Sequence, residues 1–365
     1  MDKDNLLYTL ALLMVHKIGP KMAKNLIAYC GSAENVFRQK KGLLAKIPGI
    51  GAKLSERISA FKDFSRAEEE LKFIEKHSIK PLYFMDENYP QRLRDLHDAP
   101  VLLFYKGNAP LNYKRVIGIV GTRKATDYGR AFCEQLVEEL MPYNAQIVSG
   151  LAYGIDTVAH KAAVKYNLPT IGVMGTGLDK IYPNANRSLA VQMIENGGLL
   201  TEYISGTEPD REHFPARNRI VAGMTDALIL VETTRTGGAL ITAEIAHSYN
   251  REVFAAPGRL NDEFSAGCNY FIKINKAYLL EKAADIAFQL GWDETDQKPD
   301  KSARYKDLSK HELEIINILK EKDRVDLDNI THLLGADLST VSMLLLELEF
   351  KGLVQALPGK FFRLQ

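Results

Sequence analysis

The part of the chain between residues 110 and 290 alternates short apolar runs with longer amphipathic stretches. Five apolar runs of strand length stand out, at residues 115–120, 146–148, 170–174, 227–231 and 252–255. A strand that is buried on both faces has this composition, which is typical of a parallel sheet. Helix-length stretches, such as residues 131–140 and 157–166, lie between the runs. The pattern therefore predicts a doubly wound α/β sheet, whose ligands bind beyond the carboxyl ends of its strands.

Segments of different character flank this central part. Residues 1–80 show helical periodicity with glycine-containing turns, and they predict a small all-α domain. Residues 291–303 contain almost no apolar side chains and predict a linker. Residues 304–365 predict a small helical unit that ends in two short strands. We therefore expect a helical domain over 1–80, an α/β domain over 81–290, a linker over 291–303 and a C-terminal domain over 304–365.

Composition limits the class of protein. The chain has 365 residues, 46% of them hydrophobic, and 47 Lys and Arg against 46 Asp and Glu. This near-neutral balance excludes a polybasic arm but leaves room for a local basic patch. The three cysteines, Cys30, Cys133 and Cys268, are far apart, which excludes a disulfide framework and favours a reducing compartment. The apolar stretch at residues 6–15 is too short to span a bilayer. We expect a cytoplasmic protein without a membrane segment.

The first 80 residues contain the same turn twice. Residues 17–24 and 47–54 each place glycine immediately before a predicted helix, a pattern that resembles the helix-hairpin-helix motif of non-specific DNA binders. Over residues 1–80, 15 Lys and Arg against 9 Asp and Glu leave a net charge of +6, which supports contact with a polyanion. A purely structural helical module with glycine turns is the alternative, and the sequence leaves both open.

Loops rich in glycine, hydroxyl groups and cations occur at the ends of the predicted strands. They comprise residues 121–124, 149–156, 175–184, 214–219 and 235–238. Glycine-rich backbone presents amides to phosphate, and arginine and lysine side chains supply cations. Because several such loops share one edge of the sheet, they predict a site for an oxyanion.

Common phosphate-binding and catalytic motifs do not fit these loops. Gly121 is not followed by the spacing of a dinucleotide fingerprint, and Ser149 stands where an acid would hold the ribose. The pair Gly359-Lys360 lacks the upstream glycine of a P-loop. His160 and the other histidines stand apart from any nucleophile or metal motif, and His160 is expected to pair with Asp156 on a helix surface. We expect no catalytic residue, no metal and no cofactor.

Four motifs together resemble the DprA/Smf family of DNA-processing proteins: Gly121-Thr122-Arg123, residues 149–156, residues 175–179 with Tyr182-Pro183, and residues 214–220. The resemblance implies an extended Rossmann-like domain that binds single-stranded DNA as a homodimer. It also implies that the protein loads the RecA recombinase onto incoming strands during natural transformation and displaces single-strand-binding protein. A SAM-like helical N-terminal domain and a winged-helix C-terminal domain are expected beside it.

Single-strand binding requires cations along the phosphates and flat surfaces for the bases. Arg123 and then Lys124 are the first expected contacts, and Tyr182 is a candidate stacking platform. Phe214 is expected more as a core anchor than as a stacker. Of Arg217 and Arg219, we expect one to meet DNA and the other to brace the loops through Asp156 or Asp179. The predicted DNA-binding residues are Gly121, Thr122, Arg123, Lys124, Ser149, Gly150, Gly154, Lys180, Tyr182, Asn186, Arg187, Phe214, Arg217, Asn218, Arg219, Gly237 and Gly238.

An alternative function comes from residues 236–244, which are similar to a signature of lysine-decarboxylase-like nucleoside monophosphate phosphohydrolases. Here Thr242 and Glu244 are only two residues apart and Ile241 replaces the glycine of that signature, so the catalytic spacing is broken. Glu244 is expected on a helix face instead.

Two further expectations concern partners. The resemblance implies a dimer interface in the Rossmann-like domain, for which Ile245, Tyr249 and residues 270–272 are candidates, although core packing explains them equally well. In the C-terminal unit, residues 339–349 occupy the place of a recognition helix but contain two acids and no cation. Because readers of the major groove need cations, we expect this unit to contact protein.

Overall fold

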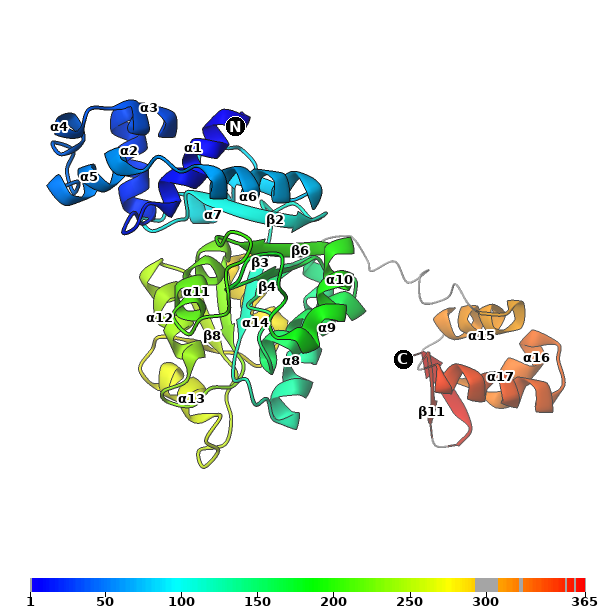
Figure 1. The fold of residues 1–365 in the computed structure, drawn as a ribbon. Coiled ribbons are helices and arrows are strands. Elements are labelled where there is room, and N and C mark those ends of the chain that lie inside the picture. Colours follow the sequence, from blue (N-terminus) through cyan, green and yellow to red (C-terminus); the bar gives the residue numbers. More distant parts are fainter. Residues whose placement is uncertain (1, 293–307, 322–323, 352, 358, 365) are drawn as a thin grey trace. The chain divides into compact units, whose positions relative to one another are not determined.

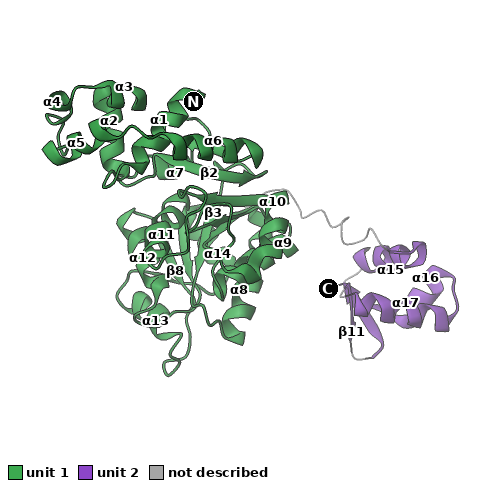
Figure 2. Ribbon diagram, in the orientation of Figure 1, with its two compact units in different colours: residues 1–295 green, residues 296–365 purple. Residues whose placement is uncertain are grey.

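The computed structural model describes residues 2–292, 308–321, 324–351, 353–357 and 359–364. The chain divides into two compact units, residues 1–295 and 296–365 (Figure 2). Among the described residues, the helices are all too short or too polar to cross a bilayer.

A sheet of nine strands in the order β1-β2-β6-β5-β4-β3-β7-β8-β9 organises the first unit (Figure 1). The strands are β1 Lys80–Tyr83, β2 Leu102–Gly107, β3 Val116–Val120, β4 Gln146–Ser149, β5 Thr170–Val173, β6 Gly197–Thr201, β7 Ala227–Leu230, β8 Glu252–Ala255 and β9 Tyr278–Leu279. Pairing is parallel from β6 to β9, whereas β1 with β2 and β2 with β6 are antiparallel. The predicted α/β sheet is confirmed, with an antiparallel extension that the sequence did not indicate.

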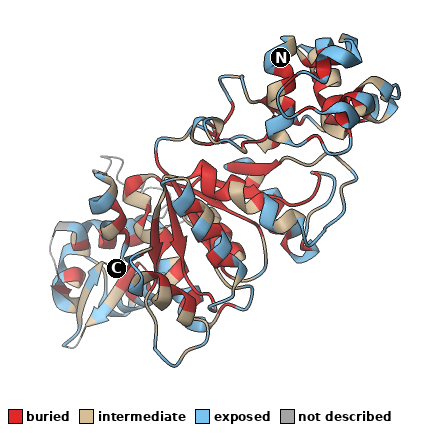
Figure 3. Ribbon diagram, turned by 90° about the vertical axis from the view of Figure 1, so that its left-hand side faces the viewer, coloured by how far each residue is buried: buried red, intermediate tan, exposed pale blue. Residues whose placement is uncertain are grey.

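Both faces of the parallel strands are covered by helices, and the strands from β6 to β8 are almost entirely buried, whereas the edge strand β9 is exposed (Figure 3). Alternate residues of β3 enter different cores: Val116 and Val120 pack with α11, α12 and α13, whereas Ile117 and Ile119 pack with α8, α9 and α14. These helices are α8 Asp127–Glu139, α9 Ile155–Lys165, α11 His213–Met224, α12 Gly238–Ser248, α13 Ala266–Lys273 and α14 Ala283–Leu290. A second helix on the α9 side, α10 Arg187–Glu195, packs on β6. The two-sided covering explains the continuous apolar runs in the sequence.

The order of the strands creates a switch point between β3 and β7. The chain builds β3, β4, β5 and β6 in one direction and then returns to place β7, β8 and β9 on the other side of β3. The loops that follow β3 and β7 therefore diverge at the carboxyl edge of the sheet. Open α/β sheets bind their ligands in the crevice that forms at this place.

The N-terminal module consists of six helices that pack on the antiparallel extension. They are α1 Lys3–Met14, α2 Pro20–Cys30, α3 Ala33–Arg38, α4 Lys41–Leu44, α5 Ala52–Ala60 and α6 Ser65–Lys76. Their apolar side chains form one core with Val101, Leu102 and Phe104 of the β2 region. The prediction of a helical N-terminus is confirmed, and its core is continuous with the sheet.

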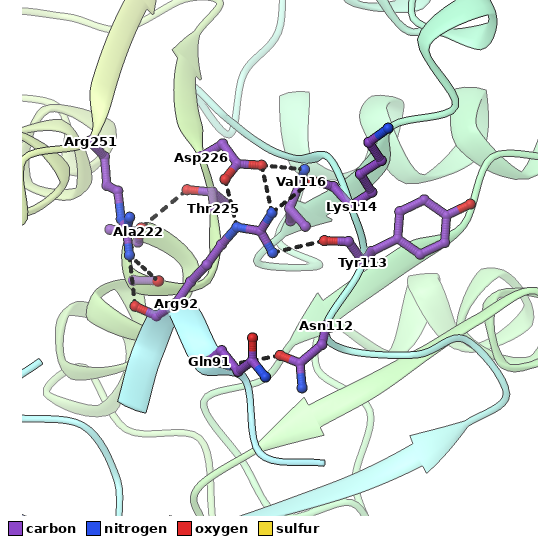
Figure 4. Close-up of polar contacts among 11 residues, drawn as sticks. Gln91, Arg92, Asn112, Tyr113, Lys114, Val116, Ala222, Thr225, Asp226 and Arg251 are labelled. Atoms are coloured by element: carbon purple, nitrogen blue, oxygen red, sulfur yellow. Dashed lines mark hydrogen bonds and ion pairs between the residues drawn. The ribbon is translucent and has the colours of Figure 1, made fainter. Parts of the chain in front are cut away.

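Arg92 on the short helix α7 Gln91–Arg94 ties this extension to the base of the parallel sheet (Figure 4). Its guanidinium donates from Nε and Nη2 to the carboxylate of Asp226, at 2.6 and 2.9 Å, and to the carbonyls of Tyr113 and Lys114. Asp226 also accepts a hydrogen bond from the amide of Val116, at 2.8 Å. This fork of hydrogen bonds fixes the starts of β3 and β7 relative to each other, at the edge of the sheet opposite the crevice.

The predicted linker lies mostly outside the described residues, and its two described residues, 291 and 292, belong to the first unit. Gly291 ends α14 in the left-handed conformation. The ring of Trp292 lies 6.4 Å from that of Tyr143 and 5.4 Å from the guanidinium of Arg115. The single tryptophan of the chain therefore packs against side chains of the α/β domain, at the end of that domain in the sequence.

The second unit is a small winged-helix arrangement with its own apolar core. Helices α15 Lys310–Glu321, α16 Leu327–Leu334 and α17 Leu338–Phe350 pack on a three-stranded sheet of β10 Val325–Asp326, β11 Val354–Leu357 and β12 Phe361–Leu364. Two of these strands form the expected C-terminal hairpin, and β10 is an addition to it.

Candidate nucleic-acid interface

A cavity of about 410 Å³ opens at the switch point, between the loops that follow β3 and β7. The end of β3, the loops after β3, β4 and β7, and the starts of α9, α11 and α12 contribute its walls. Nine predicted DNA-binding residues line it: Gly121, Thr122, Arg123, Lys124, Phe214, Arg217, Asn218, Gly237 and Gly238. The structure thus brings together loops that are more than 100 residues apart in the sequence.

Backbone hydrogen bonds hold the first loop, residues 121–124, in place. The amide of Thr122 donates to the carbonyl of Glu232 at 2.6 Å, and the carbonyl of Thr122 accepts from the amide of Ile155 at 3.2 Å. The side chains of Arg123 and Lys124 remain exposed. This loop presents two cations on a fixed backbone, as a phosphate contact requires.

The backbone of Gly154 packs directly against the backbone of the first loop, at residues 122 and 123. It adopts φ +77° and ψ −129°, and a Cβ there would lie 2.1 Å from the carbonyl oxygen of Thr122. Glycine is therefore required both by backbone conformation and by the close approach of residues 122 and 123. Its predicted role as a DNA contact is better described as support for the loop that carries Arg123.

An aromatic surface adjoins the cations. The guanidinium of Arg123 lies 5.5 Å from the ring centre of Phe214, and the ring of Tyr182 lies 5.6 Å from that of Phe214. Tyr182 is exposed and Phe214 is half-buried. Tyr153, an exposed aromatic that the sequence analysis did not select, lines the same hollow with Arg123 and Tyr182. Its position in the glycine-rich loop after β4, one of the predicted ligand-binding loops, could have identified Tyr153 as a candidate.

Arg217 is buried beneath the cavity and braces two strand ends. Its guanidinium donates to the carbonyls of Gly150 and Val173, and its Nε donates to Asn218 at 3.2 Å. Asp156 accepts hydrogen bonds from the amides of Gly150 and Ala152, at 3.1 and 3.4 Å. Burial raises the pKa of Asp156, while the charge of Arg217 and these amides lower it. Of the arginine pair, Arg217 is thus the brace, and it acts mainly through carbonyls.

Arg219, the other member of the pair, is not presented to a ligand as we had expected. It forms an ion pair with Glu202 and donates to the carbonyl of Asp98 at 2.7 Å. Its side chain is only 14% exposed. The two arginines therefore both stabilise the chain, because α11 directs them toward different buried partners.

Two further predicted residues hold loops instead of facing solvent. Ser149 is buried and donates to the carbonyl of Ile119 at 2.6 Å. Asn186 is buried and donates to the carbonyl of Leu151 at 2.9 Å and to Thr157 Oγ1 at 2.8 Å. Polar side chains close to strand ends resemble ligand contacts in the sequence, but here they satisfy buried backbone groups.

The remaining predicted cations lie further along the rim. Arg187 is exposed at the start of α10. Lys180 is exposed and forms an ion pair with Glu208, which raises the pKa of the Lys180 ammonium. Because both partners are exposed, this pair is weak and a phosphate can replace the carboxylate.

The residues of the hydrolase alternative are not arranged as a catalytic pair. Thr242 lines the cavity, but the carboxylate of Glu244 forms an ion pair with Lys276 at 2.7 Å. His160 does not pair with Asp156 on a helix surface, as we had expected. It is fully buried, lies 2.7 Å from Thr170 Oγ1, and burial lowers its pKa to about 3. Its imidazole is therefore neutral and structural.

Several candidate dimer contacts are used by the core of the chain itself. Phe271 is buried, and the hydroxyl of Tyr249 donates to the carboxylate of Asp98. Ile245, Tyr270 and Ile272 are partly buried against the same core. Core packing accounts for all of them.

The fold and the cavity define a doubly wound α/β domain with a cation-bearing cavity at its switch point, preceded in the chain by a helical module and followed by a winged-helix unit. The family described as "DNA recombination-mediator protein A" matches residues 80–291, more than half of the chain. A "SAM-like Helix-hairpin-helix tandem" matches residues 9–61, and a "DprA winged helix domain" matches residues 299–360. The chain belongs to the DprA/Smf family of DNA-processing proteins, as the sequence motifs had predicted.

Relatives and solved structures agree with this assignment. The chain is 37% identical over 270 residues to protein Smf of Synechocystis, covering 72% of this chain and 67% of that protein. It is 44% identical over 202 residues to DprA of Streptococcus pneumoniae, covering 55% of this chain and 71% of that protein. The X-ray structure of the Streptococcus pneumoniae protein matches with a TM-score of 0.68 and 34% identity, over 80% of this chain and 99% of that one. DprA of Helicobacter pylori, which is described as binding single-stranded DNA, matches with a TM-score of 0.54 and 30% identity, over 59% and 97%.

Proposed function

We propose that this protein binds single-stranded DNA along the carboxyl edge of its sheet and loads RecA onto that strand. In this proposal the protein acts during natural transformation, displaces single-strand-binding protein, and works as a homodimer through its α/β domain. The DNA-binding step needs no covalent chemistry from the protein.

The observation that carries the proposal is the composition of the switch-point cavity and its rim. The loop of residues 121–124 supplies two exposed cations on a fixed backbone, and Phe214 and Tyr182 continue from Arg123 as an aromatic surface. Cations for phosphates and flat rings for bases are the two elements that single-strand binders combine. Gly237 and Gly238 at the start of α12 add open backbone on the opposite wall.

The number of available cations predicts how binding depends on salt. Residues 112–290 carry a net charge of −1, so the domain as a whole does not attract DNA. Of the predicted DNA-binding cations at the carboxyl edge, four are exposed: Arg123, Lys124, Lys180 and Arg187. We therefore expect the salt slope, the decrease in the logarithm of the binding constant per unit increase in the logarithm of salt concentration, to be moderate. Each neutralised phosphate of a single strand contributes only about 0.7 to this slope.

The double variant Arg123→Ala/Lys124→Ala tests the site. We expect its affinity for oligo-dT to fall by roughly tenfold near physiological salt, and its salt slope to fall by about 1.4, since two phosphate contacts are lost. Fluorescence anisotropy across a salt series measures both quantities. Lys114→Ala/Lys165→Ala removes the same charge at the amino edge of the sheet and should bind like the wild type. Equal effects of the two double variants would reject the site.

The mediator step has its own test. On single strands coated with single-strand-binding protein, the wild-type protein is expected to shorten the lag of RecA-dependent ATP hydrolysis. Arg123→Ala/Lys124→Ala should leave the lag long, because the strand is not captured. If the wild type binds oligo-dT and yet leaves the lag unchanged, DNA binding stands and the RecA step is wrong.

For the winged-helix unit we propose contact with protein. The helix α17 contains Glu347 and Glu349 and no cation, while Met343, Leu346 and Phe350 are exposed on it. Since the unit has its own core, residues 304–365 can be produced alone. We expect no binding of a short DNA duplex at micromolar concentration in physiological salt, measured by anisotropy. Micromolar binding would contradict the proposal.

A further inference from the structure

We propose that Glu232 is a positioning residue for DNA binding: its buried carboxylate holds the loop that carries Arg123 and Lys124 in the conformation that meets the phosphates. The proposal rests on the function proposed above for the switch-point cavity. Glu232 is not among the described residues that line this cavity, so it acts through the loop and not by touching the strand.

The carboxylate of Glu232 interrupts an otherwise apolar segment. Strand β7 and Val231 after it are buried and apolar, and Glu232 follows them with its side chain fully buried. A carboxylate is costly to bury unless hydrogen bonds or a cation compensate it. In the part of the chain that the structure describes, the hydrogen bonds to this carboxylate all come from Thr126.

Glu232 holds both ends of the cationic loop. At the far end, the amide of Thr126 donates to Glu232 Oε2 at 2.9 Å, and the hydroxyl of Thr126 donates to Oε1. The same hydroxyl caps α8 by accepting from the amide of Gly129 at 3.2 Å. At the near end, the backbone carbonyl of Glu232 accepts from the amide of Thr122 at 2.6 Å. Residues 122–126 are therefore fixed at both ends by one residue.

Gly129, in the first turns of α8, leaves the space that this carboxylate fills. A Cβ at Gly129 would lie 2.2 Å from Glu232 Oε2 and 2.4 Å from its Cδ. Glycine within a helix lowers stability relative to alanine, because it has more conformational freedom in the unfolded chain. Here it admits a negative charge beside the N-terminus of the helix, where the helix dipole favours an anion. The acid after β7 and the glycine of α8 thus form one fitted contact.

This contact also connects two walls of the switch-point cavity. Thr233, which follows Glu232, lines the cavity, and its amide donates to the carbonyl of Phe264 in the loop after β8 at 2.6 Å. The loop of residues 121–124 forms another wall. Holding the two loops together keeps the exposed side chains of Arg123 and Lys124 at a fixed place on the rim. Preorganised cations lose less conformational entropy when they bind a phosphate.

Electrostatics and positioning predict opposite effects when Glu232 is replaced. Glu232 is an acid close to a site for a polyanion, so loss of its charge alone would strengthen DNA binding. Loss of its oxygens would instead release Thr126 and the loop, which weakens binding. Glu232→Met removes the charge and both oxygens and keeps a long unbranched side chain. Glu232→Gln removes the charge but keeps an oxygen for the amide of Thr126.

The first measurement is fluorescence anisotropy of the full chain with oligo-dT across a salt series. We expect Glu232→Met to bind about fivefold more weakly than the wild type, with a salt slope lower by about 0.7 to 1.4, since one or two phosphate contacts are lost. Glu232→Gln should bind as tightly as the wild type or more tightly. The matched control is Glu202→Met, which removes a largely buried acid directly after β6 and should not weaken binding.

Two further measurements separate positioning from a general loss of structure. In the Arg123→Ala/Lys124→Ala background, Glu232→Met should cause no additional loss of affinity, because it acts through those two side chains. Amide hydrogen exchange of residues 122–126 requires no DNA, and it should be faster in Glu232→Met than in Glu202→Met. Thr126→Val removes only the hydroxyl donor and should show the same changes if Glu232→Met does not fold, whereas Thr126→Ser should behave like the wild type.

The outcomes distinguish this inference from the function on which it rests. If Arg123→Ala/Lys124→Ala weakens binding but Glu232→Met and Thr126→Val do not, the inference alone is wrong. Unchanged amide exchange of residues 122–126, or an equal loss of affinity in both backgrounds, also overturns it. If Arg123→Ala/Lys124→Ala itself binds oligo-dT like the wild type, the function proposed for the cavity is wrong, and the positioning role is wrong with it.

Discussion

Replacing Gly154 by alanine is expected to destabilise the first unit by about 3 kcal/mol, through backbone strain at a position that L-residues rarely adopt and through direct contact. The new Cβ would lie 2.1 Å from the carbonyl oxygen of Thr122 and 2.6 Å from the carbonyl carbon of Arg123. Both are backbone atoms, so relief requires movement of the whole loop. Urea unfolding measures the loss, and anisotropy with oligo-dT measures the accompanying displacement of Arg123.

Gly206 provides a matched control. It has the same φ of +77°, but a Cβ there meets no atom within 4 Å. Gly206→Ala should therefore cost only about 1 to 2 kcal/mol from backbone strain, and it should leave oligo-dT binding unchanged. If the two variants lose equal stability and equal affinity, contact with residues 122 and 123 is not what requires glycine at 154.

Removal of the Arg217 guanidinium is expected to cost about 3 to 5 kcal/mol of stability, because a buried charge and its partners lose their compensation. Arg217→Met keeps most of the apolar volume but leaves the carbonyls of Gly150 and Val173 without their donor. It also leaves the buried carboxylate of Asp156 without the cation that lowers its pKa. Arg187→Met, at an exposed position, should change stability by less than about 0.5 kcal/mol.

The loss in Arg217→Met should depend on pH in a defined direction. Burial already raises the pKa of Asp156, and without Arg217 this pKa rises further. A carboxyl whose pKa is higher in the folded state favours folding when protonated and loses that contribution as pH increases. The loss of unfolding free energy in Arg217→Met relative to the wild type, measured by urea unfolding, should therefore be larger at about pH 8 than at about pH 5. If this loss of unfolding free energy were independent of pH, the lost hydrogen bonds to the carbonyls would account for it alone.

The elements that could be predicted are those with one dominant local signal. Strands β3, β4, β5, β7 and β8 are mostly apolar because helices cover both faces of them. Strand β6 escaped prediction because it begins with Gly197 and Gly198. The structure shows why: a Cβ at Gly198 would lie 2.3 Å from the ring of Tyr105, and one at Gly197 would lie 2.0 Å from the carbonyl of Thr170. A packing requirement between distant strands cannot be inferred from periodicity.

The candidate site also has some features that local sequence predicts and others that depend on tertiary contacts. The loops at strand ends were predicted because their glycines and cations are local features, and the cavity gathers Arg123, Lys124 and Phe214 as expected. Which of these polar side chains face solvent was not predictable. Arg217 and Asn186 satisfy buried carbonyls, and Arg219 forms an ion pair with Glu202. Tyr153, in contrast, is an exposed ring beside the cations.

The amino-acid sequence by itself determined the class of fold, the family and the edge of the sheet where the candidate site lies, because these follow from apolar runs and short motifs. The tertiary structure alone decided the switch point between β3 and β7, and the assignment of each arginine to a brace or to the surface. The physical reason is that a guanidinium bonds to whichever carbonyl or carboxylate the packing places within reach. Those partners lie 17 to 121 residues away along the chain.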